Sequence, residues 1–241
     1  MARIDEKDLS ALLQEKANLR LVEPGIYSVL PNNESGNEYD TFFGVFYDIV
    51  ACNPIYNRLI WGYSVKAFQK IAQDALYSST EGMVLDLGCG ALAFTANTYS
   101  NYKERPVVLS DQSLKMLRMA KKRIEKHRGS MPENLVFLHA DALDLPFKEN
   151  SFETILSENL LHCLSDTSIL LEGLKKIKTE SGKLFFTTLI KNNRYSDRYL
   201  EALAEKGKIV PRSEEDHRKI FAECEMAAKY KSTGAMLSIT Y

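Results

Sequence analysis

The stretch Val84-Leu85-Asp86-Leu87-Gly88-Cys89-Gly90 decides the fold of this 241-residue chain. A mostly apolar run leads into a loop that has two glycines one residue apart. Glycine lets the backbone turn tightly in such a loop and lets a ligand come close to it. A strand that ends in this kind of loop is typical of the first βα turn of a nucleotide-binding α/β sheet.

After Gly82, short apolar runs alternate with helical stretches, which predicts parallel βαβ units. Ser113 is expected as the N-cap of one helix and Gly129 as its C-terminal stop. The pattern therefore predicts an α/β fold with a doubly wound, mostly parallel sheet. The expected strands are 83–87, 106–111, 135–141, 152–158, 182–190 and 236–241, and the expected helices are 93–102, 113–129, 166–178, 196–207 and 213–230.

The first 80 residues show no convincing buried strand and are predicted to form helices, with an exposed break at 31–40. The segment from Tyr39 to Tyr77 is densely aromatic, which fits either core packing or a helical lid over a ligand. We therefore predict two parts, an N-terminal helical lid or extension at 1–80 and a ligand-binding core at 81–241. The last strand could be a sheet edge that pairs with another chain, and the oligomeric state stays open.

Composition excludes several function classes. The chain has 31 Lys and Arg residues and 32 Asp and Glu residues, with a formal net charge of -1, which argues against a nucleic-acid partner. No apolar run approaches the roughly 18 residues of a membrane-spanning helix, so we expect a cytoplasmic protein with no membrane partner. The cysteines are scattered without a Cys-x-x-Cys pair, so neither a disulfide framework nor a metal site is expected.

Asp86 distinguishes between two classes of nucleotide ligand. Gly88, Gly90 and Ala93 satisfy the dinucleotide pattern G-x-G-x-x-A, and a candidate ribose-binding acid, Asp111, follows about 20 residues later. In a dinucleotide site, however, the Asp86 carboxylate would face a pyrophosphate, and like charges repel. A cofactor with a cationic group and no phosphate fits better, and S-adenosylmethionine (SAM) is such a cofactor. An NAD(P)-dependent oxidoreductase is the alternative.

The segment from about 82 to 190 resembles the class I SAM-dependent methyltransferases, whose first motif reads roughly V-L-D-x-G-C-G-T-G. Ala91 and Leu92 replace the last Thr and Gly of that motif, and the missing third glycine leaves less room beside the methionyl group. The resemblance implies the class I fold and SAM as the cofactor.

Two further segments resemble the same family. Ser110-Asp111-Gln112-Ser113 resembles its D-x-S run, which implies that Asp111 binds both ribose hydroxyls. Ala140-Asp141-Ala142 resembles its G-D-A run, which implies that Asp141 accepts from the adenine amino group and that the Ala142 N–H contacts the ring. The cofactor-binding residues implied are Asp86, Gly88, Cys89, Gly90, Asp111, Gln112, Asp141, Ala142, Glu158, Asn159 and Tyr47.

The resemblance also implies methyl transfer to a small-molecule acceptor by in-line displacement. Such a reaction needs orientation, exclusion of water and, for some acceptors, a base. Glu158, Asn159 and His162 follow the fourth predicted strand and are expected on the methyl side. His162 is the predicted base, because its unperturbed pKa lies near neutrality, and a structural histidine is the alternative.

Two N-terminal pieces resemble segments that precede the core in quinone-biosynthesis-like methyltransferases. These pieces are Phe46-Tyr47-Asp48 and Tyr56-Asn57-Arg58-Leu59. The resemblance implies that Tyr47 or Tyr56 closes over the methionyl end, whereas a packed aromatic side chain is the alternative. The catalytic candidates are thus His162, Glu158, Tyr47 and Tyr56.

Other interpretations stay open. A protein with this fold could bind SAM without catalysis, or could have lost SAM because Leu92 fills the place of the third glycine. Cys52 and Cys163 would suit a thiol-using metalloid methyltransferase, although cysteine is usually a core residue. Among the other histidines, His139 is expected to be structural, and two are expected to face solvent, namely His127 and His217. The acceptor and its methylated atom are not determined.

Overall fold

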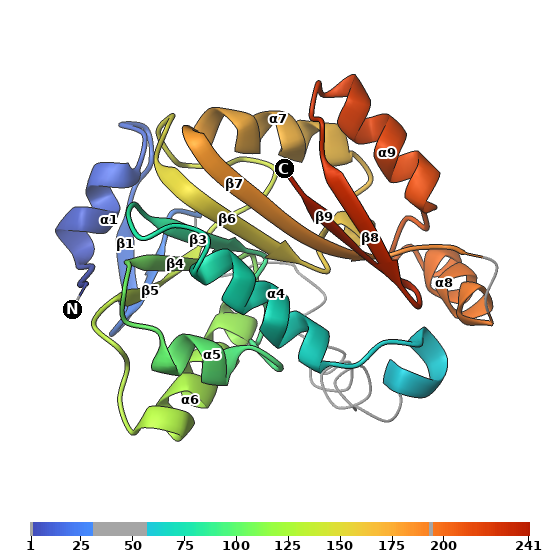
Figure 1. The fold of residues 1–241 in the computed structure, drawn as a ribbon. Helices are drawn as coiled ribbons and strands as arrows, with labels where there is room; N and C mark the ends of the chain where they lie inside the picture. The colour runs from blue at the N-terminus through green and yellow to red at the C-terminus, as the bar shows by residue number, and fades with distance from the viewer. Residues whose placement is uncertain (1, 31–56, 193–194) are drawn as a thin grey trace.

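The structure, a computed structural model, describes residues 2–30, 57–192 and 195–241. Within these residues, a nine-stranded sheet crosses the molecule with helices on both of its faces (Figure 1). The strand order is β1-β2-β5-β4-β3-β6-β7-β9-β8. The neighbouring pairs from β2 to β7 in this order are parallel, and the others are antiparallel. The predicted doubly wound, mostly parallel α/β fold is confirmed.

The central strands lie where the apolar runs predict them, because each run is buried between two layers of helices. The strand β6 (Phe152–Glu158) has the predicted bounds, while β7 starts four residues earlier than expected. The other strands are β1 (Arg20–Glu23), β2 (Ile26–Ser28), β3 (Val84–Leu87), β4 (Val107–Asp111), β5 (Leu135–His139), β7 (Lys178–Leu189), β8 (Lys229–Thr233) and β9 (Met236–Thr240).

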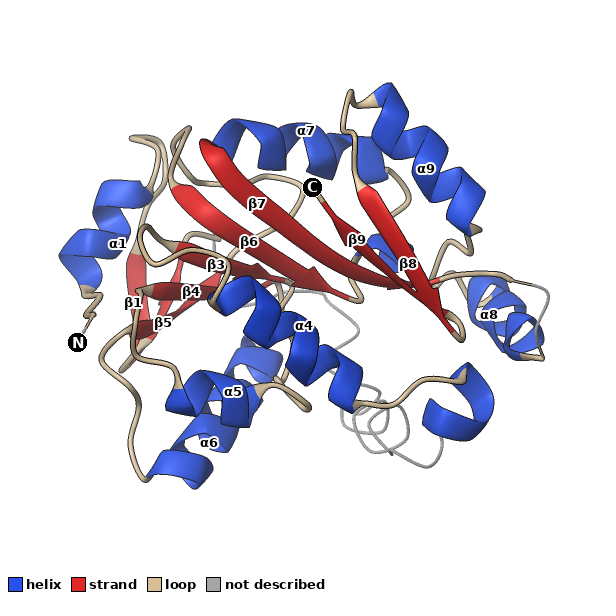
Figure 2. Cartoon of the chain, in the orientation of Figure 1, coloured by secondary structure: helices blue, strands red, loops and turns tan. Residues whose placement is uncertain are grey.

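Helices cover the sheet in two layers (Figure 2). Helices α4 to α6 pack on one face, and α1, α7 and α9 pack on the opposite face. The caps of α6 are as predicted: the Ser113 hydroxyl accepts from the Met116 N–H, and Gly129 has a φ of 87°. The helices are α1 (Glu6–Leu12), α4 (Lys66–Leu76), α5 (Ala96–Asn101), α6 (Leu114–Arg128), α7 (Thr167–Ile177), α8 (Ser196–Glu205) and α9 (Glu214–Glu223), with short turns η2 (Asn57–Trp61) and η3 (Leu161–Cys163).

The expectation that the first 80 residues contain no buried strand is wrong. The hairpin of β1 and β2 joins the sheet because β2 pairs in parallel with β5. Ile26 is fully buried, and the turn before it contains Gly25 with a φ of 81°. Both strands are too short for a periodicity signal, but the dipeptide Pro24-Gly25 is a turn signal that sequence reasoning could have used.

The C-terminal segment differs from the prediction in two ways. Helix α9 ends at Glu223, seven residues earlier than expected, because Glu225 takes a φ of 58° and the chain then enters β8. The last strand, β9, is not an edge strand, because it lies between β7 and β8.

Candidate functional site

The strand order places the switch point of the sheet between β3 and β6. From β3 the chain moves outward through β4 to β5, and it then crosses back to add β6 and β7 on the other side of β3. Ligands of open α/β sheets bind at the carboxyl ends of the strands beside such a switch point. The candidate site is therefore built from the residues that follow β3, β4, β5 and β6.

The glycine loop after β3 is folded against the end of β4. The N–H groups of Gly88 and Cys89 donate to the Ser110 carbonyl oxygen at 2.8 and 3.0 Å. Gly88 and Gly90 have φ values of 71° and 55°, a region that glycine enters at little cost. A Cβ atom added to Gly90 would have no neighbour within 4 Å, so the loop leaves open space there.

Asp86 is the most constrained acid of the site. Its side chain is 2% exposed, and its Oδ2 accepts a hydrogen bond of 2.6 Å from the Tyr99 hydroxyl. Its Oδ1 is buried and has no hydrogen-bond partner among the described residues. Burial raises the pKa of Asp86 to about 7, with an opposing effect of the Tyr99 hydrogen bond and a further rise from the Asp111 charge.

Glu158 and Asn159, at the end of β6, bring further free polar atoms to the switch point. Within the described residues, Glu158 Oε1 and Asn159 Oδ1 are buried without a hydrogen-bond partner. Burial, with the neighbouring Asp86 charge, raises the pKa of Glu158 well above its usual value. Asn159 has a φ of 57°, and its N–H donates to the Thr187 carbonyl oxygen at 2.8 Å. Both residues therefore lie at the carboxyl end of β6, beside the switch point, and their predicted place on the methyl side stays a prediction.

The acids after β4 and β5 are held by backbone amides. Asp111 Oδ2 accepts from the Gly90 N–H and its Oδ1 accepts from the Ser113 N–H, each at 2.8 Å. The Gln112 carbonyl oxygen lies 3.0 Å from His139 Nε2. Asp141 Oδ1 accepts from the Leu143 N–H at 2.9 Å, and the adjacent Ala142 is partly exposed. A carboxylate has several acceptor positions, so Asp141 can accept from a ligand besides the Leu143 N–H.

His162 is buried, and its contacts are those of a residue that stabilises the fold. It is 2% exposed, and its Nδ1 lies 3.2 Å from Thr188 Oγ1 and accepts from the Leu189 N–H at 3.3 Å. Burial lowers the pKa of His162 to about 3, helped by the charges of His217 and Arg212. An imidazole with this pKa is neutral at physiological pH and is a weak proton acceptor, so its predicted role as a base gains no support from the structure.

Of the three other histidines, two lie as predicted and one does not. His139 is fully buried and bonds Ser28 across the sheet, as expected for a structural residue, and His127 is exposed as expected. His217, expected to face solvent, is fully buried. It lies one helical turn before Phe221, which packs on Phe186 of β7, so both residues share the buried face of α9.

The remaining candidates lie partly outside the described residues. Tyr47, Tyr56 and Cys52 fall in the segment 31–56, so their predicted roles stay predictions. Cys163 is partly buried, and its thiol lies 3.7 Å from the Asn159 carbonyl oxygen. Among the residues described, no group of three or more His, Cys, Asp or Glu side chains has a metal-binding arrangement.

Tyr99 is a site residue that the sequence analysis misses. It lies on α5, directly after the glycine loop, and donates to Asp86. Its position on the expected crossover helix of residues 93–102 is the signal that could have found it, since one side of that helix must face the strand that carries Asp86.

An aromatic cluster lies beyond the glycine loop. Phe94, which follows this loop, stacks on Phe68 of α4 with ring centroids 5.2 Å apart, and Trp61 meets Tyr199 of α8 edge to face at 5.7 Å. The same cluster contains Leu189, the last residue of β7. The carboxyl end of the sheet is therefore bordered by aromatic and aliphatic side chains.

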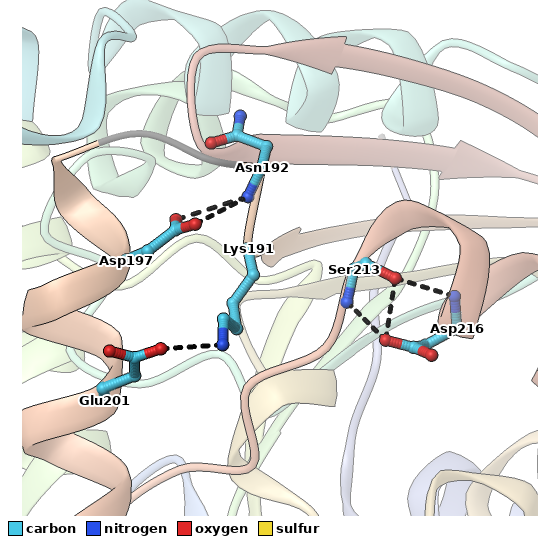
Figure 3. Close-up of polar contacts among 6 residues, drawn as sticks. All are labelled: Lys191, Asn192, Asp197, Glu201, Ser213 and Asp216. Carbon is cyan, nitrogen blue, oxygen red and sulfur yellow. Dashed lines mark hydrogen bonds and ion pairs between the residues drawn. The ribbon is translucent and has the colours of Figure 1, made fainter.

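Polar contacts fix the segment after β7 to the neighbouring helices (Figure 3). Lys191 forms an ion pair of 2.8 Å with Glu201 of α8, and the Asn192 N–H donates to the Asp197 carboxylate. Ser213 and Asp216 form a capping box at the start of α9. The contacts of Lys191 and Asn192 link α8, which carries Tyr199, to the end of β7.

Comparison with known proteins agrees with this geometry. A family model described as a methyltransferase domain matches residues 78–231. The ubiquinone/menaquinone biosynthesis C-methyltransferase UbiE of Vibrio cholerae is 21% identical over 232 residues, which cover 87% of this chain and 88% of that protein. The malonyl-[acyl-carrier protein] O-methyltransferase of Legionella pneumophila is 29% identical over 106 residues. This match covers 44% of the chain and spans 36% of that relative's length.

Solved structures share the fold at low identity. A SAM-dependent methyltransferase from Aquifex aeolicus superimposes with a TM-score of 0.56 at 18% identity, covering 81% of this chain and 96% of that one. Geranyl diphosphate C-methyltransferase from Streptomyces coelicolor, in complex with S-adenosyl-L-homocysteine, has a TM-score of 0.58 at 11% identity. That match covers 78% of this chain and 83% of the other.

Proposed function

Because the chain belongs to the methyltransferase domain family, we propose that it transfers a methyl group from SAM to a small-molecule acceptor. The observation that carries this proposal is the set of buried oxygens without partners at the switch point. Asp86 Oδ1 and Glu158 Oε1 belong to two carboxyl groups on neighbouring strands, and no described cation pairs with either. Buried charges are normally paired, so a cationic ligand is the complement that this pair lacks.

The residues present fit SAM. When bound, SAM supplies an electrophilic methyl group on a sulfonium cation, along with a free ammonium group. The chain would hold the cationic end with Asp86, Glu158 and Asn159, and the ribose with Asp111. Asp141 and Ala142 would hold the adenine, and the open space at Gly90 would admit the ligand close to the backbone.

Glu158 is our candidate for the residue that accepts a proton from the acceptor. The residue is partly exposed, its Oε1 has no hydrogen-bond partner among the described residues, and burial raises the pKa of its carboxyl group, which makes the carboxylate a stronger proton acceptor than an ordinary glutamate. His162 has none of these properties. The aromatic border of the site favours an apolar or aromatic acceptor, in keeping with the quinone-related relative.

The proposal also covers the location of the protein in the cell and the division of the chain into an extension and a core. No helix among the described residues has the length and hydropathy needed to cross a bilayer, and we propose a cytoplasmic enzyme without nucleic-acid or membrane partners. The division into an extension at 1–80 and a core at 81–241 is retained, with 20–28 now counted as part of the sheet. Helices α1 and α4 cover the two faces of the sheet, so the predicted lid role is kept in the proposal only for N-terminal residues outside these helices and the hairpin of β1 and β2.

Calorimetric titration with SAM, S-adenosylhomocysteine and NADH tests the cofactor. We expect both sulfur nucleotides to bind the wild-type protein and NADH not to bind. Asp111→Ala should weaken SAM binding roughly a hundredfold, because two hydrogen bonds to a charged group are lost. A matched control is Asp166→Ala, since Asp166 also accepts from two backbone amides but caps α7, away from the site.

The outcomes separate the alternatives. Binding of NADH alone would contradict the proposal in favour of an oxidoreductase. Equal losses in the two Asp→Ala variants would show that the Asp111 effect is structural. Turnover is tested separately, by mass spectrometry of phenolic, amine and apolar acceptors incubated with SAM. SAM binding without turnover of any acceptor class would favour a non-catalytic binder.

A further inference from the structure

The hydroxyl of Tyr99 is fixed in place by its surroundings. Tyr99 is fully buried on α5, and its ring packs in an apolar cluster with residues of β3, β4 and α6. A ring held in this way has little rotamer freedom, so its one polar atom has a defined position. That atom lies 2.6 Å from Asp86 Oδ2.

The other titratable groups around Asp86 are all acidic. Asp111 on β4 and Glu158 on β6 carry carboxyl groups, and the thiol of Cys89 lies in the glycine loop. Within the described residues, Tyr99 is the one group that donates a hydrogen bond to Asp86. Burial raises the pKa of Asp86, and the Tyr99 hydrogen bond is the contact that opposes this rise.

The same contact decides which oxygen is free. Because Oδ2 accepts from Tyr99, Oδ1 is left buried and without a partner at the switch point. Glu158 Oε1 is the second such oxygen, on the neighbouring strand. A cation held at this point would meet two carboxylate oxygens that no other described group occupies.

We propose that Tyr99 is a positioning residue that keeps the Asp86 carboxylate ionised and turned toward the cationic part of SAM. This inference rests on the proposed function, because it assumes that SAM is the ligand. A tyrosine can form this hydrogen bond and a phenylalanine cannot, since the two side chains differ only in the hydroxyl group that donates to Asp86.

The test is calorimetric titration of SAM into wild-type protein, Tyr99→Phe and Tyr102→Phe across about pH 6 to 9, the range in which a carboxyl with a pKa near 7 changes charge. Tyr102 is a matched control because it is equally buried and follows the same helix. Its hydroxyl donates to the Leu76 carbonyl oxygen at 2.9 Å and accepts from Arg105 at 3.0 Å, so neither of these hydrogen-bond partners is a carboxylate. Thermal unfolding verifies that both variants are folded.

We expect Tyr99→Phe to weaken SAM binding roughly fivefold near pH 7, because loss of the donor raises the pKa of Asp86 by about one unit, from about 7 in the wild-type protein. The difference from wild type should shrink as pH rises, because Asp86 then ionises without help. Adenosine, which lacks the methionyl cation, should bind Tyr99→Phe and wild type equally. Tyr102→Phe should bind SAM as wild type does at every pH.

Several results would overturn the inference. They are unchanged SAM binding in Tyr99→Phe, a loss that is the same at every pH, or an equal loss of adenosine binding. Asp86→Asn gives an independent check, because SAM binding to it should lose this pH dependence, and Tyr99→Phe added to it should have no further effect. If wild-type protein binds neither SAM nor S-adenosylhomocysteine at any pH, the proposed function itself fails.

Discussion

Leu92 stands where the first motif of the family has its third glycine, and its backbone keeps a conformation that glycine favours. Its φ is 50°, in the left-handed region that costs a non-glycine residue roughly 1 kcal/mol. The side chain does not fill the ligand space, because it is 3% exposed and packs in the core beside Ala96 and Tyr99. The loop therefore keeps its shape without the glycine, at some cost in backbone strain.

We expect Leu92→Gly to lower stability without tightening the binding of SAM. Removal of a buried leucine side chain costs about 2 to 5 kcal/mol, which exceeds the strain relieved. Urea unfolding and calorimetry measure the two effects, and Leu92→Ala is the control that removes the side chain and keeps the strain. Tighter SAM binding by Leu92→Gly would instead support the idea that Leu92 crowds the cofactor.

At the same scale, the sequence predicts residues whose role depends on local geometry. Asp86, Gly88, Gly90 and Asp111 could be predicted as candidates because the strand, the loop and the spacing to the next acid are visible in the sequence. The contact between Tyr99 and Asp86 depends on how α5 packs on β3: the expected helix 93–102 indicates that one of its sides faces this strand, but not which residue meets Asp86. The burial of His217 is missed for the same reason, since it depends on which face of α9 meets β7.

At the scale of elements, the parallel strands that follow Gly82 were predictable, and the short strands β1, β2 and β8 were not. In the run 152–158, the apolar residues are buried because helices cover both faces of the sheet, so the place of the strand can be predicted from the sequence. β8 has a mostly exposed pattern and exists through its pairing with β9. Antiparallel edges of this kind are stabilised by tertiary contacts more than by their own sequence.

The hairpin of β1 and β2 gives a prediction at this scale. If β2 is part of the sheet, Ile26→Ala should destabilise the protein by about 2 to 4 kcal/mol, because Ile26 is fully buried against β5. Leu21→Ala, on the neighbouring β1, is the control and should change stability by less than about 0.5 kcal/mol, since Leu21 is 57% exposed. Urea unfolding measures both. Equal and small effects would show that these residues do not join the core.

At the scale of the whole molecule, two sets of buried groups change the stability of the fold in opposite directions as pH rises. His162 and His217 have pKa values lowered to about 3 and 4, so below their unfolded value of 6.5 the unfolded chain binds more protons. Their contribution is therefore lost as pH falls below 6.5. Asp86 and Glu158 have raised pKa values, so in the ligand-free protein stability falls as pH rises above their unfolded values. In the weakly acid range, the two histidines make the stability rise with pH, whereas the two carboxyl groups make it fall. A bound cation would remove the contribution of the carboxyl groups.

His217→Leu separates these contributions. Neither ring nitrogen of His217 has a hydrogen-bond partner among the described residues, so an apolar side chain of similar size loses no hydrogen bond. The wild-type protein must keep this imidazole neutral, which costs about 2 kcal/mol more at pH 5 than at pH 7. We therefore expect His217→Leu to raise the melting temperature at pH 5, relative to wild type, by roughly 4 to 8 °C more than at pH 7. His127→Leu, an exposed position on α6, should show no such difference between the two pH values. A pH dependence of melting that is the same in His217→Leu and wild type would mean that His217 titrates normally and is accessible to water.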